Sequence, residues 1–222
     1  MPLRVSALRT LGAYANVFAV ESFMDELAAA AGQDPVALRL AHLGDPRARA
    51  VIELAAKKAG WERSEKGDGT RGRGIAFAKY KNLATYVAVV AEIEIDRKSG
   101  QVRVPKAFAV ADAGQIINPD GLTNQIEGGM IQSTSWTLHE AVRFDRNGIT
   151  SRDWNGYPIL IMPEVPDVEV TLIDRPGEKP LGAGEASQGP MAAAIANAFA
   201  HASGRRLREL PFSPSRVQTL LG

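Results

Sequence analysis

The amino-acid sequence predicts an α+β fold, with a helical N-terminal unit followed by mixed strands and helices. Two observations predict it: apolar residues recur at helical spacing up to residue 59, and from residue 85 they alternate, as they do in strands. A chain of 222 residues with 45% hydrophobic content can also bury a substantial core. The expected division is a helical unit over 1–61, a linker over 62–74 and an α+β portion over 75–222.

Three helices are expected in the N-terminal unit. Apolar side chains repeat at helical spacing over 16–31, which predicts the first helix. Asp34-Pro35 and Asp45-Pro46 are each typical of a helix N-cap followed by the first helical residue. They predict two further helices, which end near residues 43 and 59.

The second part of the chain begins with a predicted β-hairpin. Residues 85–95 alternate apolar and polar side chains, with Glu92 and Glu94 on the polar face. A polar connection over 96–100 leads to a second apolar stretch over 101–111. Two such stretches joined by a short polar turn predict paired strands.

The remaining elements are expected further along the chain. Residues 120–141 predict a helix, in which Gly128 and Gly129 lower the helix propensity and indicate close packing. Residues 168–173 predict a strand, and the alanine-rich stretch 190–203 predicts a helix that ends at a glycine. The sequence contains no internal repeat.

Composition excludes several classes of function. The chain has 26 lysines and arginines against 25 acidic residues, so no strong net charge favours nucleic acid or a membrane surface. It has no cysteine, which excludes disulfides, thiolate zinc sites and cysteine-ligated iron–sulfur clusters within the chain. No apolar run reaches membrane-spanning length. We expect a cytoplasmic protein, unless a partner with an export signal carries it to the periplasm.

No metal-ligating side chains are predicted. His42, His139 and His201 are widely separated in the sequence, and none belongs to a metal-binding pair. A serine nucleophile motif and a glycine-rich phosphate loop are also missing from the sequence.

The most informative segment is 181–190, with the sequence Leu-Gly-Ala-Gly-Glu-Ala-Ser-Gln-Gly-Pro. Gly182, Ala183 and Gly184 are small residues that let a backbone approach a bulky ligand. Glu185 follows them, just before a predicted helix whose N-terminus favours anions. A carboxylate held there could be a catalytic base or the neighbour of a metal. The alternative is a glycine-containing turn in which Glu185 is merely solvated.

Two other polar residues are candidates for ligand contacts. Gln125 lies in the predicted helix 120–141, and its amide could hold the edge of a heterocycle. Arg9 lies in a glycine-containing loop before the first helix, where a guanidinium could clamp a phosphate or carboxylate. Either side chain could instead be exposed to solvent.

Taken together, these segments resemble the C-terminal part of molybdopterin-binding subunits of the xanthine dehydrogenase/aldehyde oxidase family, and most closely its isoquinoline 1-oxidoreductase β-subunit type. The similar segments cover nearly the whole chain in the family's order: 9–10, 18–28, 34–39, 72–76, 112–119, 125–129, 182–185, 194–198 and 210–211. The resemblance implies that residues 75–222 form part of a molybdopterin-binding domain.

The resemblance also implies roles for the candidate residues. In that family the glutamate of the Gly-x-Gly-Glu run is the catalytic base beside molybdenum, which corresponds to Glu185. Gln125 corresponds to a contact with the pterin, and the backbone of 182–184 to a segment that approaches the metal centre. Arg9 corresponds to an arginine in a loop that lines the active site, although Arg-Thr-Leu-Gly replaces the usual Arg-Gly-aromatic-Gly here.

The implied reaction is the oxidative hydroxylation of an aldehyde or N-heteroaromatic substrate, with oxygen from water and Glu185 as proton acceptor. Partial desolvation is expected to raise the pKa of that carboxylate. The resemblance also implies that this chain shares the molybdopterin cofactor with a partner chain that carries the N-terminal part of the subunit. Iron–sulfur clusters of the 2Fe–2S type would lie in a separate small subunit, so this chain alone is expected to be inactive. The alternative function is a non-catalytic structural or interaction module derived from such a subunit.

Overall fold

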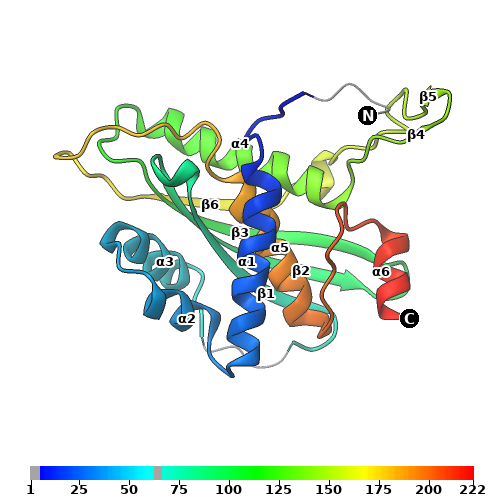
Figure 1. Cartoon of the computed structure of the whole chain (residues 1–222), viewed down its shortest axis with the longest axis horizontal. Helices are drawn as coiled ribbons and strands as arrows, with labels where there is room; N and C mark the ends of the chain where they lie inside the picture. Colours follow the sequence, from blue (N-terminus) through cyan, green and yellow to red (C-terminus); the bar gives the residue numbers. More distant parts are fainter. Residues whose placement is uncertain (1–5, 63–66) are drawn as a thin grey trace.

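The structure is a computed structural model that describes residues 6–62 and 67–222, and its centre is a four-stranded sheet. In the order β1-β2-β3-β6, the strands are Arg71–Lys79, Tyr86–Asp96, Gln101–Asp112 and Asp167–Leu172. The first three are antiparallel neighbours, whereas β6 runs parallel to β3. Helices cover both faces of the sheet, so the fold has three layers (Figure 1).

The α-helices of the described residues are α1 (Ala13–Ala30), α2 (Pro35–His42), α3 (Pro46–Lys58), α4 (Pro119–Leu138), α5 (Gln188–Ser203) and α6 (Pro214–Leu221). The shorter elements are the 3-10 turns η1 (Tyr80–Asn82) and η2 (Met162–Glu164) and the small hairpin β4 (Phe144–Asp145) and β5 (Gly148–Ile149). None of the helices in these described ranges is long and apolar enough to cross a membrane.

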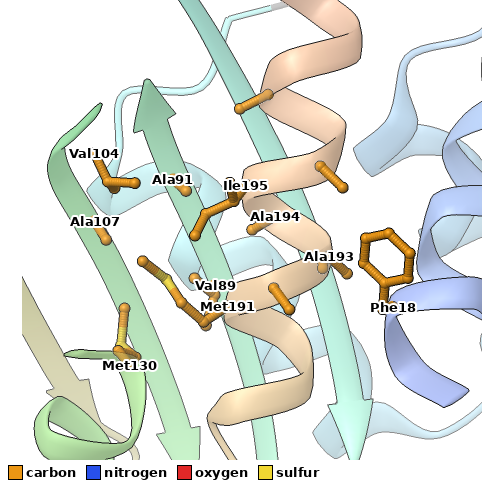
Figure 2. Packing of buried hydrophobic residues seen from close by; sticks show 14 of the residues in the cluster. Phe18, Val89, Ala91, Val104, Ala107, Met130, Met191, Ala193, Ala194 and Ile195 are labelled. Atoms are coloured by element: carbon orange, nitrogen blue, oxygen red, sulfur yellow. The ribbon is translucent and has the colours of Figure 1, made fainter. Parts of the chain in front are cut away.

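Alternation along β2 divides the core between the two faces of the sheet. Val87, Val89 and the following odd-numbered residues join an apolar cluster with α5 and with Phe18 of α1. Figure 2 shows this cluster, in which α5 lies between the sheet and Phe18. Ala88 and Val90 point to the opposite face and pack with α3. Both faces of the strand are therefore apolar, as expected for a strand covered on both sides.

Helix α5 packs unusually close to the sheet, and the residue types explain why. The helix is rich in alanine, and nearly all of it is buried. On β1, a Cβ atom at Gly72 or Gly74 would overlap the backbone of α5 at Ala194 and Ala198. Only glycine lets the strand and the helix backbone approach this closely.

The α+β fold class and most of the expected elements are confirmed. Asp34 and Asp45 each accept hydrogen bonds from two backbone N–H groups at the starts of α2 and α3, as predicted for N-caps. The predicted hairpin corresponds to β2 and β3. Helix α4 ends at Leu138, three positions before the expected end of the 120–141 helix.

The expected linker over 62–74 is wrong in its last part. Residues 71–74 belong to β1 and pair with 91–94 of β2, while residues 63–66 lie outside the described part. Gly72 and Gly74, which lie in the expected linker, instead allow the close approach of α5. Helix α6 was not expected either. The division into a helical unit and a separate α+β portion stays a prediction.

Candidate active site

Glu185 lies in the loop between β6 and α5, just before the helix begins. Its Oε1 accepts a hydrogen bond from the backbone N–H of Thr10 at 2.9 Å. Its Oε2 accepts a hydrogen bond from the hydroxyl of Tyr80 at 2.6 Å. The residue is half-buried, and both carboxylate oxygens have protein donors. This geometry disfavours the alternative of a merely solvated side chain in a turn.

The two hydrogen bonds lower the pKa of Glu185. Donation by Tyr80 has the largest effect, followed by donation from Thr10, and the positive charges of Lys81 and Arg9 act in the same direction. The expected raised pKa is therefore wrong for this chain, because burial is outweighed. Burial and the adjacent carboxylate raise the pKa of Tyr80 to about 12. At neutral pH the glutamate is thus an anion and the tyrosine a hydrogen-bond donor.

Arg9 joins the loop of Glu185 to helix α4. Its Nε donates to the carbonyl of Gly184, and its Nη2 donates to the backbone and side-chain oxygens of Gln125 at 3.2 and 3.1 Å. Its Nη1 donates to Oε1 of Gln132 at 3.3 Å. Three candidates from widely separated segments therefore lie together. In this chain the guanidinium holds carbonyl and amide oxygens, so it organises the loops around the site.

Backbone geometry marks the loop that carries Arg9 as strained. Thr10 and Leu11 have φ angles of 76° and 54°, the left-handed region that residues with side chains rarely adopt. Each such residue costs on the order of 1–3 kcal/mol and persists only where its surroundings enforce it. Here the hydrogen bonds from Arg9 and from the Thr10 N–H hold the loop against the Glu185 segment.

Gln188 is a third residue around Glu185 that was not singled out in the sequence. It is fully buried at the start of α5. In the amide orientation that satisfies both of its polar atoms, its nitrogen donates to the Glu185 carbonyl at 3.2 Å. Its oxygen then accepts from Arg9 Nε at 2.7 Å. Its position three residues after Glu185, at a helix start, is the signal that could have identified it.

Tyr80 and Thr10 were also missed, and no local pattern identifies them. They are separated from Glu185 by 105 and 175 positions in the sequence. Only the packing of β1 and α1 around α5 brings them to the carboxylate.

The surface beside Glu185 can hold a polar ligand. Gly182, Gly184 and Gln125 are exposed, and a Cβ atom at Gly182 would meet open space. Among the described residues, no group accepts a hydrogen bond from the backbone N–H groups of 182–184. Unpaired backbone N–H groups bind anions, and an amide can pair with a heterocycle edge. These residues therefore fit an anionic cofactor that contains a hydrogen-bonding ring system.

The same surface offers no metal-ligand set of its own. Within 6–62 and 67–222, no group of three or more histidines, aspartates or glutamates is arranged to hold a metal ion.

The three-layer fold (Figure 1) places the glutamate beside a glycine-rich, exposed backbone, an arrangement that suits the binding of a cofactor. A family model described as molybdopterin cofactor-binding domain matches residues 10–166. The chain belongs to this family, and the resemblance found in the sequence is confirmed. Molybdopterin, the cofactor that the resemblance implies, is the cofactor that this family is named for.

Curated relatives cover almost the entire chain. It is 44% identical to a nicotinate dehydrogenase subunit of Pseudomonas putida over 99% of its length, which is 20% of that protein. It is 34% identical to the β-subunit of isoquinoline 1-oxidoreductase of Brevundimonas diminuta over 96% of its length, or 27% of that protein. The chain thus spans about a fifth to a quarter of the curated relatives it matches.

Solved structures show the same fold. The aldehyde oxidoreductase of Desulfovibrio desulfuricans matches 97% of this chain with a TM-score of 0.81, over 41% of its own chain and at 18% identity. The quinoline 2-oxidoreductase of Pseudomonas putida matches 62% of this chain with a TM-score of 0.58, over 18% of its own chain and at 28% identity.

Proposed function

We propose that this chain is the part of a molybdenum hydroxylase that supplies the catalytic base, Glu185, and one side of the molybdopterin site. The observation that carries the proposal is the carboxylate held on both oxygens beside exposed, unpaired backbone N–H groups. The names of the relatives support N-heteroaromatic substrates such as nicotinate and isoquinoline, and an aldehyde is the other class. We propose the N-heteroaromatic class, because the two relatives described above, at 44% and 34% identity, are named for such substrates.

The cofactor supplies the redox chemistry when it is bound. The net reaction adds an oxygen atom from water to an electron-poor carbon and releases two electrons and two protons. Glu185, ionised at neutral pH, accepts a proton from the attacking oxygen through its carboxylate. Tyr80 and Thr10 fix the direction in which that carboxylate points.

Other residues bind and position rather than transfer protons. The backbone N–H groups of 182–184 and the amide of Gln125 would hold the cofactor. Arg9 keeps the loop of Glu185 against α4 and would thereby hold the base in place beside a bound cofactor. The proposal includes a chain with the N-terminal part of the subunit and a small subunit with 2Fe–2S clusters that takes up the electrons. A cytoplasmic location stays a prediction.

Substitution of the proposed base tests the function. In the assembled enzyme, Glu185→Gln is expected to lower kcat by about 10²–10⁴-fold, the usual contribution of general base catalysis. The molybdenum content should stay near that of the unsubstituted enzyme, because the amide keeps the shape of the side chain. Turnover is followed with a heteroaromatic substrate, and metal content by elemental analysis.

Glu178→Gln is the matched control, since Glu178 lies in the same loop with a largely exposed side chain. It should leave kcat unchanged. If Glu185→Gln kept full turnover, the assignment of the base would be wrong. A natural complex without any molybdenum would favour the non-catalytic module instead.

A further inference from the structure

Thr85 is a buried residue that connects the turn of Tyr80 to the loop of Glu185. It lies between η1 and β2, and it is fully buried. Its carbonyl accepts the backbone N–H of Tyr80 at 3.0 Å. Its hydroxyl donates to the carbonyl of Gly182 at 2.8 Å, and its backbone N–H donates to the same oxygen at 3.4 Å. One residue thus joins the donor to the proposed base with the glycine-containing loop before that base.

The hydrogen bonds from Thr85 determine which way one peptide group of this loop points. In a trans peptide, the C=O and the N–H of the next residue point in opposite directions. Because the Gly182 carbonyl is directed at a buried hydroxyl, the N–H of Ala183 is directed away from Thr85. In the part of the chain that the structure describes, nothing accepts a hydrogen bond from that N–H. It is therefore available to a ligand, at a point where Gly182 and Gly184 are exposed.

This peptide group needs an anchor of its own. Arg9 holds the loop after it, and the N–H of Leu181, which donates to the carbonyl of Ala113 at 2.8 Å, holds the loop before it. Neither bond fixes the peptide that follows Gly182. Glycine has no side chain to restrict the rotation of its backbone, so that peptide could otherwise turn. Thr85 supplies the missing anchor.

We propose that Thr85 is a positioning residue for the cofactor site, where it holds the Ala183 N–H in place for an anionic group of molybdopterin. The inference rests on the proposed function and adds a residue to its binding site. Thr85 is buried and acts through the Gly182 carbonyl. An N–H that is already oriented binds an anion more tightly than one that must first be ordered, because the ordering cost is removed.

The first test measures how well the assembled enzyme retains its cofactor. Thr85→Val removes the hydroxyl and keeps the branched shape of the side chain. The rate of molybdenum loss on dialysis should rise by about 2- to 10-fold, the usual effect of one lost hydrogen bond. Thr85→Ser keeps the hydroxyl and should restore slow loss. Elemental analysis follows the metal, and Thr85→Ala gives the same comparison if Thr85→Val does not fold.

Thr134→Val is the matched control. Thr134 is also fully buried, and its hydroxyl donates to the carbonyl of Met130 at 2.9 Å within α4. The substitution therefore removes an equivalent hydrogen bond that does not anchor the loop of 182–184. It should leave the rate of molybdenum loss unchanged.

A second measurement observes the Ala183 N–H directly. Gly-Ala occurs only twice in the sequence, at 12–13 and 182–183, so isotope labelling of the glycine carbonyl carbon and the alanine nitrogen selects two NMR signals of the full chain. Inorganic pyrophosphate should shift the Ala183 signal. It should not shift that of Ala13, whose N–H already donates to the Thr10 carbonyl at 3.0 Å. Below saturation, Thr85→Val should reduce the shift at Ala183 by about half or more.

The two measurements separate this inference from the proposed function. If the assembled enzyme contained no molybdenum, the proposed function would fail, and the pyrophosphate titration would still decide the role of Thr85. An Ala183 signal that ignored pyrophosphate, or that responded equally in Thr85→Val, would overturn the inference. Equal molybdenum loss from Thr85→Val and Thr134→Val would also overturn it, as would a Thr85→Ser variant that behaved like Thr85→Val.

Discussion

At the scale of single residues, the site depends on one carboxylate whose two oxygens have different partners. The donor to Oε1 is a backbone N–H, which substitution of the Thr10 side chain does not remove. The donor to Oε2 is the Tyr80 hydroxyl, which one substitution deletes. Glu185 is thus an anion whose ionisation can be changed without altering the carboxylate itself.

Tyr80→Phe is expected to move the acidic limb of the kcat–pH profile to higher pH. The pKa of Glu185 is lowered mainly by the Tyr80 hydrogen bond, so its loss raises that pKa and protonates the base at a higher pH than before. Plateau kcat should fall by less than about tenfold, since only one hydrogen bond is lost. The profile is measured in the assembled enzyme.

The chain contains a matched control for this experiment. Tyr157 donates to Oε2 of Glu140 at 2.7 Å, and its pKa is likewise raised to about 12. Tyr157→Phe removes an equivalent hydrogen bond from a pair outside the proposed site, so the profile should not move. An acidic limb that stayed in place in Tyr80→Phe would show that this tyrosine does not tune the base.

At the scale of elements, sequence patterns predicted the helices and strands that are determined by interactions between residues close in the sequence. The N-caps Asp34 and Asp45 and the β2–β3 hairpin are determined by neighbouring residues, and all were predictable. Strand β1 was not predictable in this way. Its glycines allow close contact with α5, a helix that is more than 100 residues away in the sequence. Helix α6 begins with Ser213-Pro214, a signal of the same type as Asp34-Pro35, so it could have been identified.

The residues of the proposed site also fall into a group that the sequence could identify and a group that it could not. Arg9, Gln125 and Glu185 were identifiable because their segments have recognisable residue patterns. Tyr80, Thr10 and Gln188 belong to the site only through the assembled layers. Long-range packing therefore accounts for what the sequence alone could not predict.

Gly74→Ala should destabilise the protein through the β1–α5 contact. The added Cβ would overlap the backbone of Ala194 and Ala198, which cannot move aside as a flexible side chain would. Overpacking of this kind costs about 1–3 kcal/mol of the free energy of unfolding. Urea denaturation measures the loss.

Gly128→Ala is the comparison, because a Cβ atom there meets nothing within 4 Å and the residue lies inside helix α4. That substitution should be neutral or should stabilise the protein by up to about 1 kcal/mol. Equal losses in the two variants would contradict the explanation from close approach.

At the scale of the whole molecule, a network around one buried ion pair joins four elements. Arg39 of α2 donates through Nε to Oε2 of Glu21 on α1 at 2.8 Å, and their side chains are only 2% and 9% exposed. The same Oε2 accepts the backbone N–H of Phe77 on β1 at 2.8 Å. The carbonyl of Glu21 accepts from Asn197 of α5 at 3.2 Å. Through this network, the two helical layers are held in register with the strand that leads to Tyr80.

Arg39→Met should therefore be among the most damaging substitutions outside the site. It leaves Glu21 buried without its cation, which costs about 3–5 kcal/mol in the free energy of unfolding at pH 7. Arg71→Met breaks an exposed pair with Glu94, in which the side chains are 75% and 44% exposed, and should cost less than about 1 kcal/mol. Urea denaturation of both variants measures the two losses in the free energy of unfolding. Equal losses would show that the buried pair stabilises the protein no more than the exposed pair does.

The damage from Arg39→Met should also depend on pH, with a definite sign. Burial already raises the pKa of Glu21, and the attraction of Arg39 opposes that rise. Without the arginine the folded-state pKa rises further, so the folded state takes up a proton that the unfolded state releases at the same pH. Stability then increases as the pH falls from that raised value toward the ordinary pKa of glutamate. Denaturation at pH 7 and pH 5 should show a smaller deficit at pH 5, and a deficit that grew on acidification would mean that another group carries the cost.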